Sequence, residues 1–274
     1  MNNKMKKPIK ISKNIFLKKF KRTSDNFNQK LIQYIEDPND ENIHDIRVSV
    51  RRLETAYKIL PKSTREQSKI KNNIKQDRKF FKMNAKIRDF DIICANMTSK
   101  YPDRTLSLVQ SLKNSRIEHI ENANRLALKI SRLPSLEIPK SALKESKLEK
   151  KYLKVLDCIV LNIQKNTIIA LRDEEKIDEL HMLRKDFKKL RYSLEFSSDK
   201  KTTFDVLKNL KNIQDMLGEI HDSDIIINYL KSIEQNSRYS DIISAETMER
   251  NKKYNTFVTF FRKYPKADNF GLKF

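Results

Sequence analysis

Residues 43–58 read IHDIRVSVRRLETAYK, and residues 180–195 read LHMLRKDFKKLRYSLE. The two stretches align at an offset of 137 residues, which is half of the 274-residue chain. In each stretch a histidine, an arginine and two adjacent bases follow in the same order: His44, Arg47, Arg51 and Arg52 against His181, Arg184, Lys188 and Lys189. Such a repeat indicates that the chain consists of two halves with related structures.

A second repeat follows the first one in each half. Residues 85–93 read AKIRDFDII and residues 218–226 read GEIHDSDII, at an offset of 133. The aligned positions include two pairs of acids, Asp89 and Asp91 against Asp222 and Asp224. Two halves of four helices each are the simplest arrangement that keeps both repeats in order. We predict that the halves span residues 1–133 and 143–274, with a proline-containing linker at about 134–142.

Apolar residues recur at intervals of three and four along most of the chain, which is the spacing of amphipathic helices. No segment is a convincing strand, so the sequence predicts an all-α fold. Asp40 is expected to cap the second helix, and the helix-interior Gly218 is expected at a close approach of two helices. The predicted helices lie at approximately 11–35, 41–60, 65–98, 104–131, 143–172, 175–198, 203–231 and 238–263.

Composition narrows the classes of function. The net charge is +22 and the chain holds two glycines, which excludes glycine-rich phosphate loops and dinucleotide-binding turns. Two isolated cysteines, without metal-ligand spacing, are typical of a reduced cytosolic protein. No run of about 18 apolar residues is present, so no membrane span is predicted. The charge implies an anionic partner: polyphosphate, nucleic acid or a lipid surface.

The bases of the first repeat lie on one side of their predicted helix. At 100° per residue, His44, Arg47, Arg51 and Lys58 fall within about 60° of one another, beside the apolar face. His181, Arg184 and Lys188 repeat this band, with Arg191 at its flank. A band next to the core favours a groove or an interhelical cavity, and cations one turn apart suit a repetitive anion. The alternative is that these bases form salt bridges with neighbouring acids.

Further bases and acids have two interpretations each. Arg78, Lys82 and Lys86, with Lys208 and Lys211 in the second half, either extend the groove or face solvent. The acid pairs form a two-carboxylate metal or acid/base site, or Asp89 and Asp222 orient neighbouring bases or tie two helices together; we favour the second interpretation. A zinc site assembled from His44 and His181 with Asp89, Asp91 or His221 is disfavoured, because no HExxH or i, i+4 histidine pair occurs. We predict no catalytic residue, no metal and no cofactor.

On these motifs the chain resembles the CHAD family, named for a histidine-containing α-helical domain. The resemblance covers nearly the whole chain and is carried by residues 43–60, 86–93, 180–196 and 210–226. It implies a single domain over residues 1–274, made of two pseudo-twofold-related four-helix bundles with a basic central channel that binds inorganic polyphosphate. Glu54 and His221 depart from the family pattern, which often has Arg at the first position and Asn or Arg at the second.

The predicted function is therefore non-enzymatic binding of inorganic polyphosphate in the cytoplasm, at polyphosphate granules and without a membrane. The alternatives are a nucleic-acid-binding protein that uses the same charge and a metal-dependent phosphohydrolase that uses His44, His181, Asp89 and Asp222. The predicted polyphosphate-binding residues are His44, Arg47, Arg51, Arg52, Lys58, Arg78, Lys82, Arg88, His181, Arg184, Lys188, Lys189, Arg191 and Lys211.

Overall fold

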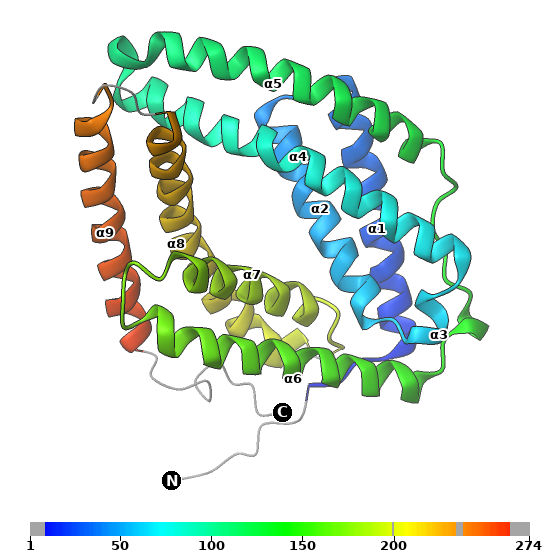
Figure 1. The fold of residues 1–274 in the computed structure, drawn as a ribbon. Helices are drawn as coiled ribbons and strands as arrows, with labels where there is room; N and C mark the ends of the chain where they lie inside the picture. Colours follow the sequence, from blue (N-terminus) through cyan, green and yellow to red (C-terminus); the bar gives the residue numbers. More distant parts are fainter. Residues whose placement is uncertain (1–8, 199, 234–237, 264–274) are drawn as a thin grey trace. The chain divides into compact units, whose positions relative to one another are not determined.

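The computed structural model describes residues 9–198, 200–233 and 238–263, and their regular structure is entirely helical (Figure 1). This confirms the predicted all-α fold class. The α-helices are α1 (Lys13–Glu36), α2 (Asp40–Ile59), α3 (Lys62–Arg65), α4 (Ser68–Lys100), α5 (Pro102–Ser131), α6 (Glu145–Ala170), α7 (Ile177–Leu194), α8 (Lys200–Ile233) and α9 (Ser240–Arg262). A 3-10 turn, η1 (Lys140–Ala142), precedes α6.

The chain folds as two compact units. The N-terminal unit comprises Leu17–Leu148, and the C-terminal unit comprises the chain from Glu149 onward together with residues 9–16. In the N-terminal unit, α4 lies along α5 and also packs on α2; in the C-terminal unit, α8 packs on both α7 and α9. Each repeated basic helix, α2 or α7, therefore lies against the long helix that carries an acid pair.

The N-cap of helix α2 lies one residue before the predicted one. Asn39 is the N-cap, and its side-chain oxygen accepts a 2.8 Å hydrogen bond from the backbone N–H of Asn42. The prediction of Asp40 as the cap was wrong, because Asp40 is the first residue inside the helix. Through the helix dipole, Asp40 stabilises the first turn of α2 and Lys58 stabilises its last turn.

The core of the N-terminal unit forms where α2 and α4 meet α1. The apolar stripe of α2, which includes Ile43, Ile46 and Val50, is completely buried. The Tyr34 ring on α1 meets the Phe80 ring on α4 edge-on, at a centroid distance of 5.2 Å. Burial of these side chains supplies the main stabilising free energy of the unit and fixes the rotation of α2, which decides where its basic face lies.

A buried carboxyl group lies beside this core. The Tyr57 hydroxyl donates a 3.0 Å hydrogen bond to Asp77, which is 3% exposed. Burial raises the pKa of Asp77 to about 7; the Tyr57 hydrogen bond opposes the shift and the charge of Glu54 adds to it. Because the folded-state pKa exceeds the ordinary value, the free energy of unfolding falls as pH rises from about 4 to 7.

Asp77→Asn is therefore expected to stabilise the protein at pH 8 and to leave its stability nearly unchanged at pH 4. The substitution removes a buried charge while keeping an acceptor for the Tyr57 hydroxyl. We expect an increase in Tm of about 3–6 °C at pH 8, measured by circular dichroism. An equal or larger increase at pH 4 would show that the charge of Asp77 is not the cause.

Residues 9–16 belong structurally to the end of α7. Ile9 and Ile11 are buried, and the Lys10 carbonyl accepts hydrogen bonds from the backbone N–H and the hydroxyl of Ser198 at 2.9 and 2.8 Å. The Phe16 and Phe196 rings lie 5.5 Å apart. This segment therefore packs against the carboxyl end of α7. Helix α7 carries the second basic row, which consists of His181, Arg184, Lys188, Lys189 and Arg191.

Gly218, within α8, does not mark a close approach of two helices. Apart from its chain neighbours and its own helix backbone, a Cβ placed on Gly218 would meet no atom of the described residues within 4 Å. The predicted reason for this glycine was therefore wrong, and the fold provides no other.

Candidate functional site: two basic surfaces

Arg47 and Arg51 on α2 are held against one aromatic ring of α4. The guanidinium carbons of Arg47 and Arg51 lie 4.4 and 4.6 Å from the centroid of the Phe81 ring. Arg47 also donates a 3.1 Å hydrogen bond from Nη1 to the Phe81 carbonyl oxygen. Stacking on a ring orients a guanidinium without cancelling its charge. Phe81 is therefore a positioning residue that the basic pattern alone did not reveal.

The remaining predicted residues of the N-terminal unit lie on the same two helices. Arg78 Nε is 3.6 Å from Glu54 Oε1. Glu54, which departs from the family pattern, therefore forms an ion pair with a predicted binding residue. Lys82 directly follows Phe81 and is exposed. On α2, His44 is exposed and Arg52 and Lys58 are half-buried, while Arg88 on α4 is half-buried.

Two histidines meet in the C-terminal unit. The Nδ1 atoms of His181 on α7 and His221 on α8 are 3.1 Å apart, and the ring centroids are 4.4 Å apart. The pKa of His221 is lowered to about 2, first by burial and then by the positive charges of Arg184, His181, Lys188 and Lys185. His221, which was not among the predicted binding residues, therefore lies in the field of the second basic row.

Lys185 is a further base that sequence reasoning missed. It is half-buried and its charge acts on His221, as do those of Arg184 and Lys188. The position next to Arg184 is a valine in the first repeat, Val48, so alignment of the two halves gave no signal for Lys185. The second row is therefore denser in charge around its histidine than the repeat predicts.

Other bases of the second row have fixed partners. Lys189 Nζ lies 2.6 Å from Oδ1 of the buried Asp186, so this ammonium is neutralised within α7. Arg191 donates a 2.8 Å hydrogen bond to Gln214, whose amide in turn donates to the Phe187 carbonyl at 2.9 Å. Lys211, on α8, is exposed. Arg191 is thus positioned by α8, much as Arg47 is positioned by α4.

The second aspartate of each acid pair ties two helices together. Asp91 on α4 accepts a 2.6 Å bond from Arg116 on α5, and Asp224 on α8 accepts a 2.9 Å bond from Arg250 on α9. Burial raises the pKa of both carboxyl groups, and the arginine partners oppose that shift. The helix-tying role was predicted for Asp89 and Asp222, whereas the acids that make these contacts between helices are Asp91 and Asp224.

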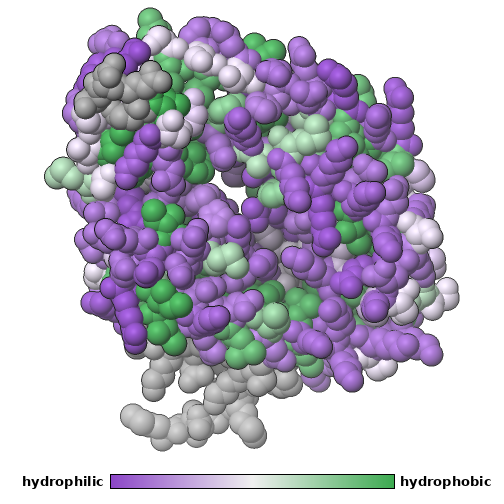
Figure 2. All heavy atoms as spheres, in the orientation of Figure 1, coloured by the Kyte–Doolittle hydropathy of each residue, from purple (hydrophilic) through white to green (hydrophobic). Residues whose placement is uncertain are grey.

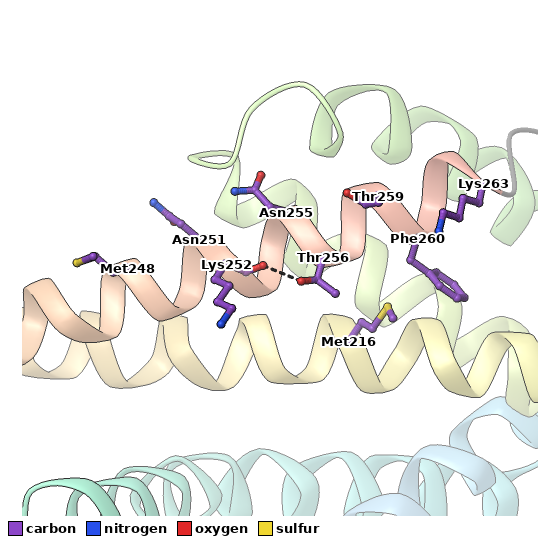
Figure 3. Close-up of a pocket in the computed structure, with 9 residues that line it drawn as sticks. All are labelled: Met216, Met248, Asn251, Lys252, Asn255, Thr256, Thr259, Phe260 and Lys263. Carbon is purple, nitrogen blue, oxygen red and sulfur yellow. Dashed lines mark hydrogen bonds between the residues drawn. The ribbon is translucent and has the colours of Figure 1, made fainter.

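The structure also contains a groove outside the predicted binding residues, and its described residues include no metal-binding cluster. A groove of about 800 Å³ runs between α8 and α9, and none of the predicted binding residues lines it (Figure 3). Among the described residues, no three or more His, Cys, Asp or Glu side chains are grouped so as to hold a metal ion.

Hydrophilic residues cover most of the face shown in Figure 2, where apolar residues occur in small scattered groups. Within the described part of the chain, none of the helices combines the length and the apolarity of a membrane span.

Comparison with known proteins identifies the class. A helical fold with a repeated basic helix agrees with a family model described as the CHAD domain, which matches residues 24–231. The chain belongs to the CHAD domain family. The crystal structure of the CHAD domain from the plant Ricinus communis is similar in fold, with a TM-score of 0.65 and 16% identity, over 90% of this chain and 88% of that chain. None of the curated proteins matches the chain.

Proposed function

We propose that this protein binds inorganic polyphosphate without catalysing its hydrolysis, through the basic rows of α2 and α7. The observation that carries the proposal is that the adjacent long helix holds bases of each row in place, two in the first row and one in the second. Phe81 on α4 positions Arg47 and Arg51, and Gln214 on α8 positions Arg191. Fixed cations lose little conformational freedom on binding, so their attraction for an anion is used efficiently.

A repetitive anion suits these rows better than a compact one. Bases at i and i+4 on a helix are about 6 Å apart along the axis, so they can contact different phosphates of one extended chain. Guanidinium groups bind phosphate oxygens in pairs, and lysines add point charge. A nucleic-acid-binding protein could use the same charge, because nucleic acid is also a chain of phosphates. A phosphohydrolase would release phosphate. The experiments below distinguish both alternatives from polyphosphate binding.

The shared central channel and the pseudo-twofold relation stay predictions of the family resemblance. Loss of binding on reversing either row alone is the expected signature of one shared channel. Two independent surfaces would each keep part of the affinity. We propose a cytoplasmic location at polyphosphate granules, which a fluorescent fusion protein would test.

The affinity for polyphosphate is expected to fall steeply with salt, because binding releases counterions from both partners. With about six phosphate contacts, raising the salt from 50 to 200 mM should weaken binding by about 10³-fold, by analogy with nucleic acids. Fluorescence anisotropy of labelled polyphosphate measures this dependence. Binding that is unchanged across this range would contradict an electrostatic site.

Phosphate release in the presence of Mg²⁺ or Mn²⁺ distinguishes the binding protein from a hydrolase. We expect no release above background from the wild-type protein or from Asp89→Ala. Metal-dependent release that is lost in Asp89→Ala would instead support the phosphohydrolase.

A further inference from the structure

Contacts with α2 fix the side of α4 that borders the first basic row. Phe81 on α4 lies against Arg47 and Arg51, and Arg78, one turn before Phe81, forms an ion pair with Glu54. At 100° per residue, Arg78 lies about 60° from Phe81 around the helix. Three further bases of α4 fall within about 80° beyond Arg78, and all three are exposed: Lys75, Lys82 and Lys86. Helix α4 therefore adds a flank of four bases to the row on α2.

The corresponding flank of α8 carries a different charge. At the offset of 133 residues, Phe81 aligns with Gln214, and Gln214 accepts a hydrogen bond from Arg191 on α7. The same side of α8 therefore borders the second basic row. The four flanking bases of α4 align, in order, with two bases and two acids, which are all exposed: Lys208, Lys211, Asp215 and Glu219.

Asp215 and Glu219 lie along the second basic row and not beyond its end. Helices α7 and α8 are antiparallel, because the Arg191–Gln214 hydrogen bond lies near the end of α7 and the histidine contact lies near its start. Both acids lie on α8 between these two contacts. Packed helix axes are about 8–10 Å apart, which is close to the Debye length of about 8 Å at physiological ionic strength. The two acids therefore lower the positive potential of the second row.

The basic helices themselves do not offset this difference. Lys185 adds one base to α7, but Lys189 on the same helix is neutralised by the buried Asp186. At two other aligned positions the charges are exchanged and their sum is unchanged: Glu54 and Lys58 against Arg191 and Glu195. The charges of the two units therefore differ most in the flanks on α4 and α8.

We propose that the N-terminal unit supplies the larger share of the affinity for polyphosphate, and that Asp215 and Glu219 weaken the equivalent surface of the C-terminal unit. The inference rests on the proposed function. A phosphate chain on the N-terminal unit meets bases on both α2 and α4. On the C-terminal unit the chain meets bases on α7 but also two carboxylates on α8, which repel phosphate.

Exchange of charge between the aligned positions tests the inference. Lys82→Asp/Lys86→Glu gives α4 the charges of α8, and Asp215→Lys/Glu219→Lys gives α8 the charges of α4. All four positions are exposed within helices, so both variants are expected to fold. In anisotropy titrations with labelled long-chain polyphosphate at 150 mM salt, we expect about tenfold weaker binding for the α4 variant and about three- to tenfold tighter binding for the α8 variant. An unchanged affinity of either variant would overturn the inference.

Added charge elsewhere is the matched control for the α8 variant. Glu149 and Asp157 are exposed on α6, outside both rows and their flanks. Each change of an acid to lysine adds two charges, so Glu149→Lys/Asp157→Lys raises the net charge from +22 to +26, as the α8 variant does. We expect the control to tighten binding by less than about twofold, because salt screens distant charges. Equal tightening by the two variants would show that net charge sets the affinity and would overturn the inference.

Acetylation of lysines in the wild-type protein, quantified by mass spectrometry, locates the ligand without any substitution. As short-chain polyphosphate is added, Lys82 and Lys86 should become protected at a concentration at least about threefold below that which protects Lys208 and Lys211. Protection of both flanks at the same concentration would overturn the inference and leave the proposed function intact. Absence of saturable binding to the wild type would overturn both.

Discussion

The fourfold variant Arg47→Glu/Arg51→Glu/Arg184→Glu/Lys188→Glu is expected to bind polyphosphate at least about 100-fold more weakly than the wild type at 150 mM salt. Each reversal removes an attraction and adds a repulsion within a row whose side chains are held in place. Arg47 and Arg51 lie against Phe81, and the positive charges of Arg184 and Lys188 act on His221, so the variant reverses two cations in each row. Anisotropy of labelled polyphosphate gives the affinities.

A control variant separates position from total charge. Lys129, Lys147, Lys154 and Lys165 are exposed on α5 and α6, outside the two rows. Reversing these four lysines lowers the net charge from +22 to +14, as the reversal of the rows does. We expect the control to weaken binding by less than about tenfold, because screening at this salt limits distant charges. Equal losses in the two variants would show that the rows are not the binding site.

Arg250→Ala is expected to be among the most destabilising single substitutions in the chain. The side chains of Arg250 and Asp224 are only 5% and 6% exposed, so removal of the guanidinium leaves a buried carboxylate without its partner. Breaking such a pair costs about 3–5 kcal/mol. This corresponds to a fall in Tm of about 10 °C or more, measured by differential scanning calorimetry.

The equivalent pair of the N-terminal unit is the matched comparison. The Arg116 side chain is 21% exposed, so water reaches part of the Arg116–Asp91 pair. Arg116→Ala should cost about 1–3 kcal/mol, less than Arg250→Ala, because water can enter the partly exposed space that the Arg116 side chain leaves beside the buried Asp91. A larger loss of stability in Arg116→Ala than in Arg250→Ala would contradict the ranking by burial.

The sequence predicted what depends on periodicity and missed what depends on tertiary contact. The helix ranges and the basic band of α2 follow from the spacing of residues such as Ile43, Ile46 and Arg47, which burial confirms for the apolar pair. The roles of Phe81 and His221 do not follow from spacing, because they arise where a second helix packs against the first. Residues 9–16 likewise show their place only through the contacts of Lys10 with the end of α7.

Repeat alignment also had a limit. It matched Asp89 to Asp222 and Asp91 to Asp224, but the helix-tying role was predicted for Asp89 and Asp222, whereas Asp91 and Asp224 make the contacts between helices. It did not indicate Arg116 and Arg250 as the partners, because helices α5 and α9 carry no recognisable repeat between them. In the sequence, Glu54 and His221 are recognisable only as departures from the family pattern. The structure shows Arg78 beside Glu54 and His181 beside His221.

The central claim, that polyphosphate is the ligand, is tested most directly by a competition titration of the full chain. Labelled long-chain polyphosphate is bound at 150 mM salt and then displaced with either unlabelled polyphosphate or single-stranded RNA of equal total charge. The account predicts saturable binding, with displacement by unlabelled polyphosphate at a concentration at least about tenfold below that required for RNA. Absence of binding, or displacement by RNA at an equal or lower concentration, would contradict it.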